Sequence, residues 1–178
     1  NSQQQSASDW NPLPTMSTTP YQHFFVAAAA NLKDLEDRAE LDGAYHYAGA
    51  AKAIRAMGFM LMTDWYGEMP YTEALSAAVT PKFDDGKTIF EGCLAEIDAA
   101  IEYFQRAQNP SAKPLSAGDS WNGGDVNKWI KMCYGLKARW LNNLSKKSTL
   151  YKPDEILSLL AQGPTSNNES VIVKHEDV

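Results

Sequence analysis

Two Trp-Asn pairs in polar segments, Trp10-Asn11 and Trp121-Asn122, are the residues whose types best suit a recognition chemistry. The C–H faces of sugar rings pack on indole rings, and an adjacent amide can hydrogen-bond the sugar hydroxyls. We therefore select Trp10, Trp121 and Asn122 as candidate glycan-binding residues. Burial of these tryptophans in the core is the competing interpretation, because Trp is a highly buried residue on average.

Catalytic chemistry has one weak candidate, the carboxylates Asp64, Glu68 and Glu73. Asp64 and Glu68 could in principle act as acid and base in a hydrolase, but solvated carboxylates in loops are far commoner. Neither a Ser-His nucleophile context nor a strand followed by a Gly-rich phosphate loop is recognisable. We therefore predict a protein without catalytic residues.

The histidines and cysteines do not indicate a metal site or a cofactor. Their spacing does not match that of zinc ligands, for any grouping of His23, His46, His175, Cys93 and Cys133. Each cysteine occupies an apolar position in a helical pattern, which predicts two buried thiols. A bridge between neighbouring helices remains the alternative.

The composition is that of a globular protein with one core. The chain has 178 residues, of which 44% are hydrophobic and 21% charged, a size and content that suit one domain. A net charge of −6 leaves no basic face for phosphates, so nucleic acid is not an expected partner. No apolar run reaches the roughly 18 residues of a membrane-spanning helix.

Apolar residues recur at helical spacing in most of the chain and predict an all-α fold. Long helices are expected over about 21–40, 42–64, 87–108 and 125–147, with Asp125 as an N-cap, and a short helix over about 153–162. Residues 1–20 are expected to be an irregular leader, residues 21–162 a helical domain, and residues 163–178 a loop with a short extended tail. The helices are predicted to form tetratricopeptide-like pairs, and a closed bundle is the alternative.

An aromatic corner is predicted after the second long helix, around Gly67 and Pro70. Gly67 can adopt a positive φ and Pro70 disfavours helix at the residue before it, so the helix ends here. The small residues of this helix should let a neighbouring helix approach closely. One buried face of this helix is expected to consist of Ala51, Ile54, Gly58, Leu61 and Trp65. The rings of Trp65, Tyr66 and Tyr71 are expected to anchor the turn against its neighbours.

Three ordered segments resemble the signature of the SusD/RagB family. The first is the Ala-rich helix from Ala48 to Arg55 that leads into Thr63-Asp-Trp-Tyr-Gly-Glu-Met-Pro-Tyr-Thr-Glu-Ala-Leu75. The second is Pro81-Lys-Phe-Asp84 with the helix that follows it, including Glu96-Ile-Asp98-Ala-Ala-Ile101. The third is Gly124-Asp-Val-Asn-Lys-Trp-Ile130, which continues to Leu136-Lys-Ala-Arg-Trp-Leu141. The third match extends to Leu144-Ser145, and together the matches cover roughly residues 21 to 147.

This resemblance implies a fold, a location and partners. It implies a SusD-like α-α superhelix in a protein that a lipid anchors to the outer membrane, at the cell surface of Bacteroidetes-type bacteria. Such a protein binds an oligosaccharide, or a peptide in some members, and delivers it to a SusC-like TonB-dependent transporter. The motif residues Lys128, Trp129 and Arg139 are expected to be structural, with Arg139 bonding a carboxylate or loop carbonyls across a helix pair.

The chain departs from the family in length and in its amino end. Family members are several times longer, so we expect this to be the amino-terminal portion of such a protein, and the lipid-bearing cysteine is not in it. The resemblance transfers no ligand contact to a particular residue. A helical-repeat adaptor that binds another protein remains the alternative function.

Overall fold

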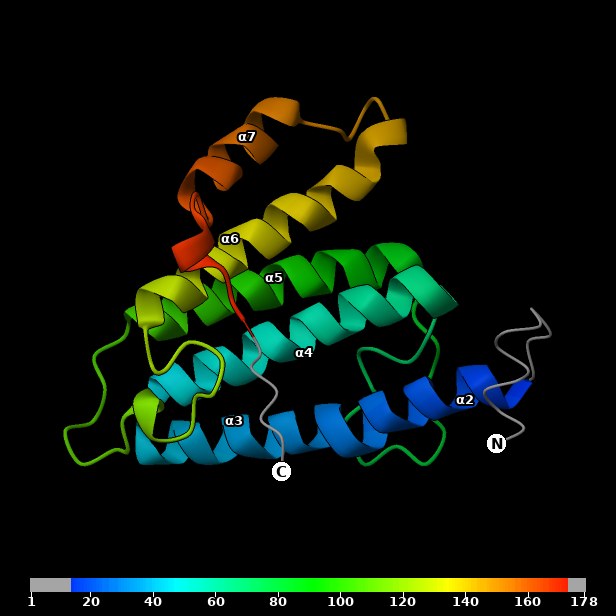
Figure 1. The fold of residues 1–178 in the computed structure, drawn as a ribbon. Helices are drawn as coiled ribbons and strands as arrows, with labels where there is room; N and C mark the ends of the chain where they lie inside the picture. The colour runs from blue at the N-terminus through cyan, green and yellow to red at the C-terminus, as the bar shows by residue number, and fades with distance from the viewer. Residues whose placement is uncertain (1–13, 173–178) are drawn as a thin grey trace, which may run out of the picture.

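The computed structural model describes residues 14–172, with side chains from Ser17 onward. The predicted all-α fold is confirmed: helices α3, α4, α5, α6 and α7 lie side by side in that order, each antiparallel pair joined by a turn or loop (Figure 1). Within the described residues, the one β-type pairing is an isolated antiparallel bridge between Met69 and Asp84. No helix in this part of the chain combines the length and apolarity that crossing a membrane requires.

The first helical segment begins earlier than predicted. Helix α2 spans Pro14–Gln22, a π-helical segment spans His23–Ala29, and α3 spans Ala30–Asp42. The prediction of irregular structure up to residue 20 was therefore wrong from Pro14 on. Pro20 lies inside α2, where it removes a backbone donor, and the wider turns that follow include a bond from Ala30 N–H to Phe25 O.

Helix α4 (Tyr45–Tyr66) forms the predicted hairpin with α3 and is the most enclosed element. Its small residues allow close approach, as expected. A Cβ added at Gly49 would lie 3.1 Å from the Ala100 carbonyl oxygen of helix α5 (Gly86–Gln105), and one at Gly58 would lie 2.2 Å from the Phe24 ring. Alanines 48, 51, 53 and 56 are fully buried.

Two residues assigned to the buried face of α4 are on its surface. Trp65 is 72% exposed and Leu61 is 42% exposed, so the expected anchoring role of Trp65 was wrong. The reason is tertiary: α3 and α5 cover two faces of α4, and the buried positions near its end belong to Phe59, Met60 and Met62. Leu61 and Trp65 lie on a third face, which helix α6 (Val126–Asn142) covers only in part: Leu61 shares a small hollow with Leu136 and Trp140 of α6.

The corner after α4 is closed by Asp84, which no helix contains. Gly67 has the predicted positive φ of 71°, and Met69 is fully buried. The Asp84 carboxylate accepts the N–H groups of Tyr71 (3.1 Å) and Thr72 (2.7 Å), and its own N–H donates to Met69 O. The first two resembling segments of the sequence therefore meet in one hydrogen-bonded corner.

The core lies between α4, α5 and helix α6 (Val126–Asn142), and helix α7 (Pro153–Gln162) packs on the outside of α6. Asp125 caps α6 as predicted, accepting the N–H groups of Asn127 and Lys128. Cys93 and Cys133 are both buried free thiols, as expected. Short 3-10 segments at Leu115–Ala117, Asn143–Lys146 and Asn167–Glu169 complete the described elements.

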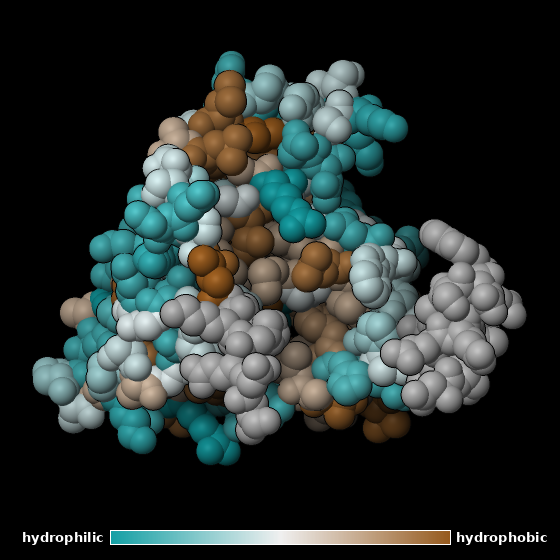
Figure 2. All heavy atoms as spheres, viewed as in Figure 1, coloured by the Kyte–Doolittle hydropathy of each residue, from teal (hydrophilic) through white to brown (hydrophobic). Residues whose placement is uncertain are grey.

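Polar groups cover most of the visible surface, and apolar groups gather over α7 and in the middle of the same face (Figure 2). Leu157 and Leu160 of α7 are among the exposed apolar residues. The predicted extended tail lies partly beyond residue 172, outside the described residues, and residues 170–172 form no strand.

Candidate functional site

The loop between α5 and α6 is organised by the carboxylate of Asp119. Its Oδ1 accepts the N–H groups of Trp121 (2.9 Å) and Asn122 (3.0 Å), and its Oδ2 accepts the Gly124 N–H (2.9 Å). The indole Nε1 of Trp129 also donates to Oδ2, at 2.7 Å. Burial alone would raise the pKa of Asp119, but these hydrogen bonds outweigh it and lower the pKa below its ordinary value.

The same loop places the Trp121 ring on an aromatic stack. The rings of Trp121 and Trp129 lie 5.7 Å apart at 11°, and Trp129 stacks in turn on Phe104 at 5.7 Å and 24°. Trp129 is buried in the core, whereas Trp121 is half-buried. The buried rings of Phe104 and Trp129 thus support the ring of Trp121, which is partly exposed.

Trp121 lines a small hollow of about 150 Å³ between the loop and α4. Trp129 and Leu115 form its inner wall, and Asp119 and Ser120 contribute polar groups. The remaining lining residues come from α3, α4 and the loop: Leu35, Tyr47, Ala50, Ala51, Ile54 and Gly118. The hollow is small for a whole ligand, since typical sites measure roughly 300 to 1,000 Å³.

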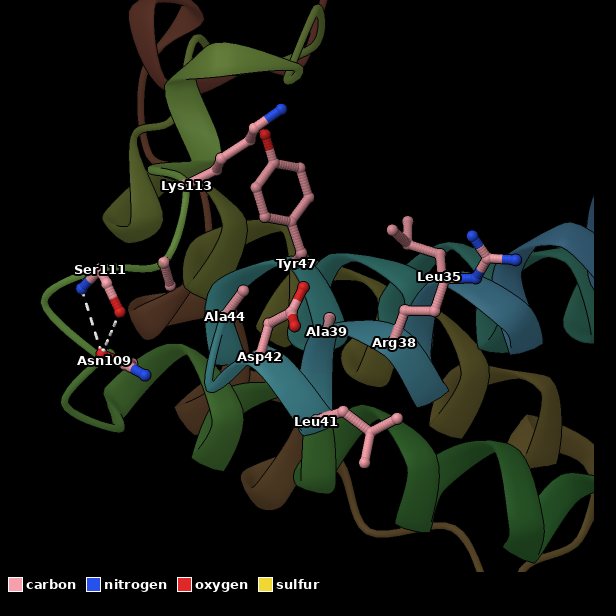
Figure 3. A pocket seen from close by; sticks show the side chains of 11 residues that line it. Leu35, Arg38, Ala39, Leu41, Asp42, Ala44, Tyr47, Asn109, Ser111 and Lys113 are labelled. Carbon is pink, nitrogen blue, oxygen red and sulfur yellow. Dashed lines mark hydrogen bonds between the residues drawn. The ribbon is translucent and has the colours of Figure 1, made fainter.

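A larger hollow of about 650 Å³ adjoins it, and Leu35 and Tyr47 line both. In Figure 3, Tyr47 rises from α4 between Lys113 and the α3 residues Leu35 and Arg38. The Tyr47 hydroxyl donates to Pro114 O at 3.2 Å. Polar groups around this hollow come from Arg38, Asp42, Asn109, Ser111 and Lys113. We call the two adjoining hollows together the Tyr47–Trp121 groove.

The far wall of the groove is tied to the α3–α4 turn. Asn109 N–H donates to Gly43 O at 3.0 Å, and a Cβ on Gly43, whose φ is 68°, would lie 2.8 Å from the Asn109 Cβ. The N–H of His46 donates to Gln108 Oε1 at 3.0 Å. Asn109 Oδ1 accepts the N–H and hydroxyl of Ser111 (Figure 3). Close backbone approach at Gly43 therefore holds this loop in place.

The structure separates the three residues selected from sequence. Trp121 lies in the groove wall. Asn122 lines neither hollow, and its side-chain nitrogen and oxygen have no solvent exposure and no hydrogen-bond partner among the described residues. Trp10 lies outside the described residues. Their role in ligand binding stays a prediction.

Sequence reasoning missed Tyr47 and Asp119. Tyr47 shares a helical stripe with Ala50, Ala51 and Ile54, which reads as core, and its spacing alone carries no sign of a surface hollow. Asp119 precedes Gly123-Gly124, and both of these glycines have positive φ (62° and 85°). An acidic residue before such a pair is a signal for a turn built around a carboxylate.

The remaining selected groups have ordinary structural places. Asp64 accepts a bond from Asn143 at 3.4 Å, and Glu73 accepts the Lys82 N–H at 3.1 Å. Arg139 is exposed. The arginine that bridges carboxylates on two other helices is Arg55. In the described residues, His, Cys, Asp and Glu form no group that could hold a metal ion.

Comparison with known proteins gives a family match over nearly the whole chain. The profile of the SusD-like family described as "Starch-binding associating with outer membrane" matches residues 2–178. Among curated proteins, none matches this sequence.

Solved structures share the fold. A Bacteroidetes SusD-like protein is 25% identical with a TM-score of 0.76, and the match covers 91% of this chain and 30% of that one. A SusD/RagB family protein from Bacteroides thetaiotaomicron is 27% identical with a TM-score of 0.70, covering 83% and 31%. A chitin-binding protein at 24% identity and a TM-score of 0.76, covering 90% and 34%, shows the shared fold alone.

This chain thus spans about a third of the length of these solved structures. The family profile covers almost all of it. The corner joins the first two segments that carried the resemblance, and the α6 cap belongs to the third. The chain belongs to the SusD-like family, whose description is starch-binding in association with the outer membrane.

Proposed function

We propose that this chain is the glycan-binding part of a cell-surface nutrient uptake system. A protein held at the outer membrane by a lipid anchor captures an oligosaccharide in the Tyr47–Trp121 groove and passes it to a SusC-like TonB-dependent transporter. The observation that carries the proposal is the Trp121 ring, supported from behind by Trp129 in the wall of a hollow.

The chemistry of the groove suits a polyhydroxylated ligand. A sugar ring offers an apolar C–H face and several hydroxyls that both donate and accept hydrogen bonds. The groove offers the aromatic rings of Tyr47 and Trp121, and beside them charged donors, amides and carboxylates. Because Asp119 and Trp129 already fix the position of Trp121, little side-chain freedom is lost when a ligand binds.

Replacement of Trp121 by alanine tests the proposal. We expect binding of maltoheptaose, measured by isothermal titration calorimetry, to weaken about tenfold, since a lost stacking contact is worth roughly 1 to 1.5 kcal/mol. Trp65→Ala is the matched control, because Trp65 is exposed and lines none of the hollows described above. Thermal unfolding of each variant separates lost binding from lost folding.

Two outcomes would contradict the proposal. Equal affinity of the Trp121→Ala variant and the wild type for every bound oligosaccharide would remove the groove as the site. Retention of a peptide but of no oligosaccharide in a ligand panel would favour a protein-binding repeat. Transfer is tested separately: the tagged protein should co-purify a TonB-dependent transporter from solubilised outer membranes.

A further inference from the structure

A third hollow, of about 500 Å³, opens between α3, α4, α5 and the corner loop. It shares no lining residue with the Tyr47–Trp121 groove. Its apolar surface comes from Phe59, Tyr71 and Leu75, and the Phe59 and Tyr71 rings pack edge to face at 4.9 Å. We propose that this hollow is a second carbohydrate site, selective for neutral sugars, and call it the Tyr71 hollow.

The charged groups of the Tyr71 hollow form a fixed network. Glu36 of α3 accepts from both Lys52 and Arg55 of α4, and Arg55 also pairs with Glu96 of α5. The side chains of Glu36, Arg55 and Glu96 are only 9%, 11% and 11% exposed. At the rim, Lys33 pairs with Asp37 at 2.5 Å. Donors and acceptors are therefore held in position before any ligand arrives.

Charge balance decides the class of ligand. Each of the three cations that line the hollow, Lys33, Lys52 and Arg55, already has a carboxylate partner, so no excess positive charge remains for an anion. An acidic ligand would also meet the Glu96 carboxylate. A hydroxyl both donates and accepts, so it can use the remaining protons of Lys52 and Arg55 together with the carboxylate oxygens.

The hollow also has hydroxyl groups and aromatic surface for a sugar ring. Thr72 and Ser76 line it from the corner loop, and the Tyr71 ring offers a surface for C–H packing. The volume lies within the range of small-molecule sites. The inference does not depend on the Tyr47–Trp121 groove, because the two sites use different residues.

Nuclear magnetic resonance of the whole chain, titrated with maltose in the millimolar range, is the test. We expect the backbone amide signals of Thr72, Leu75 and Ser76 to shift on addition of maltose, in the wild type and equally in the Trp121→Ala variant. Glucuronate should produce little or no shift at these amides. Since this footprint is read on the wild type, it does not depend on the folding of any variant.

A variant pair sharpens the test. Lys52→Met should weaken maltose binding at these amides about tenfold, because hydrogen bonds to a charged group are lost. Lys137→Met is the matched control. Like Lys52, Lys137 pairs with a carboxylate on a neighbouring helix, at 2.5 Å from Asp98, and its side chain is mostly buried (19% exposed), but it lies outside the hollow.

The outcomes separate this inference from the proposed function. Shifts confined to Ser120 and Trp121 would overturn the second site and leave the groove intact. Shifts confined to Thr72–Ser76 would support the second site and contradict the groove. A response to glucuronate without one to maltose would overturn the selectivity for neutral sugars, and a silent Tyr71 hollow would overturn the inference altogether.

Discussion

Asp119 shows how one carboxylate can shape a binding wall. Four donors converge on its two oxygens, three from the loop backbone and one from the Trp129 indole. The loop therefore has a fixed course although only the short 3-10 segment Leu115–Ala117 gives it regular structure. These hydrogen bonds fix the position of the Trp121 backbone, and this position places the Trp121 ring against Trp129.

Replacement of Asp119 by asparagine should destabilise the protein by about 2 kcal/mol in urea unfolding, because an amide offers one acceptor and turns an NH₂ group toward N–H donors. The same change should weaken oligosaccharide binding in the Tyr47–Trp121 groove. Asp98→Asn is the control: this carboxylate is half exposed, and its pair with Lys137 is worth less than about 1 kcal/mol.

The pH dependence of stability gives a second readout for Asp119. Its pKa is lowered by the hydrogen bonds, so the stabilisation is present above its unfolded pKa of about 3.9 and is lost as the pH falls through the folded pKa. The wild type should lose its advantage over Asp119→Asn below about pH 4. An advantage that stays constant from pH 7 to pH 3 would contradict the role of the charge.

At the scale of elements, the corner between α4 and α5 depends on two adjacent aspartates with different tasks. The Asp84 side chain is buried and accepts from Tyr71 N–H, Thr72 N–H and the Thr72 hydroxyl. Asp85 caps α5 by accepting the Thr88 N–H at 2.7 Å. Asp84 thus fixes the loop that follows α4, and Asp85 starts the next helix.

The two aspartates should differ in the cost of their removal. Asp84→Ala leaves the partly buried N–H groups of Tyr71 and Thr72 without an acceptor and should lower the unfolding free energy by about 2 to 3 kcal/mol. Asp85→Ala removes only a cap and should cost about 1 kcal/mol. Chemical denaturation of both variants measures the difference. Equal costs would show that the Asp84 hydrogen bonds do not hold the corner.

At the scale of the whole molecule, the Glu36–Lys52–Arg55–Glu96 network joins three helices in one place. Burial would raise the pKa of Glu36, but hydrogen bonds from Lys52 and Arg55 bring it below its usual value. Burial raises the pKa of Glu96 despite its pair with Arg55. Arg55 therefore supplies the shared positive charge that offsets the cost of burying two carboxylates.

Arg55→Met should destabilise the fold by about 3 to 5 kcal/mol at pH 7, because both carboxylates lose a buried cation. Burial already raises the folded pKa of Glu96, and the loss of Arg55 should raise it further, so the stability of the variant should increase as the pH is lowered from 7 toward 5. Unfolding curves at several pH values check this. A double variant, Arg55→Met with Glu96→Gln, should recover part of the loss at pH 7.

Local sequence signals determined the helices, their caps and the family. Periodic apolar residues predicted α3 to α7. Asp125 caps α6 and Gly67 ends α4 with a positive φ, as their residue types indicate. Three motifs led to the SusD-like resemblance. These features depend on residues within a few positions of each other. The exception is Pro20, where the helix continues through a residue that usually ends one.

Only the tertiary structure decided which surfaces meet. Leu61 and Trp65 share the periodicity of buried residues but are exposed, because α6 covers that side of α4 only in part. Tyr47 and Trp121 are 74 positions apart in the sequence, yet both line one hollow. Periodicity shows that a helix has an apolar face. Which neighbour buries that face depends on helices that are distant in the sequence.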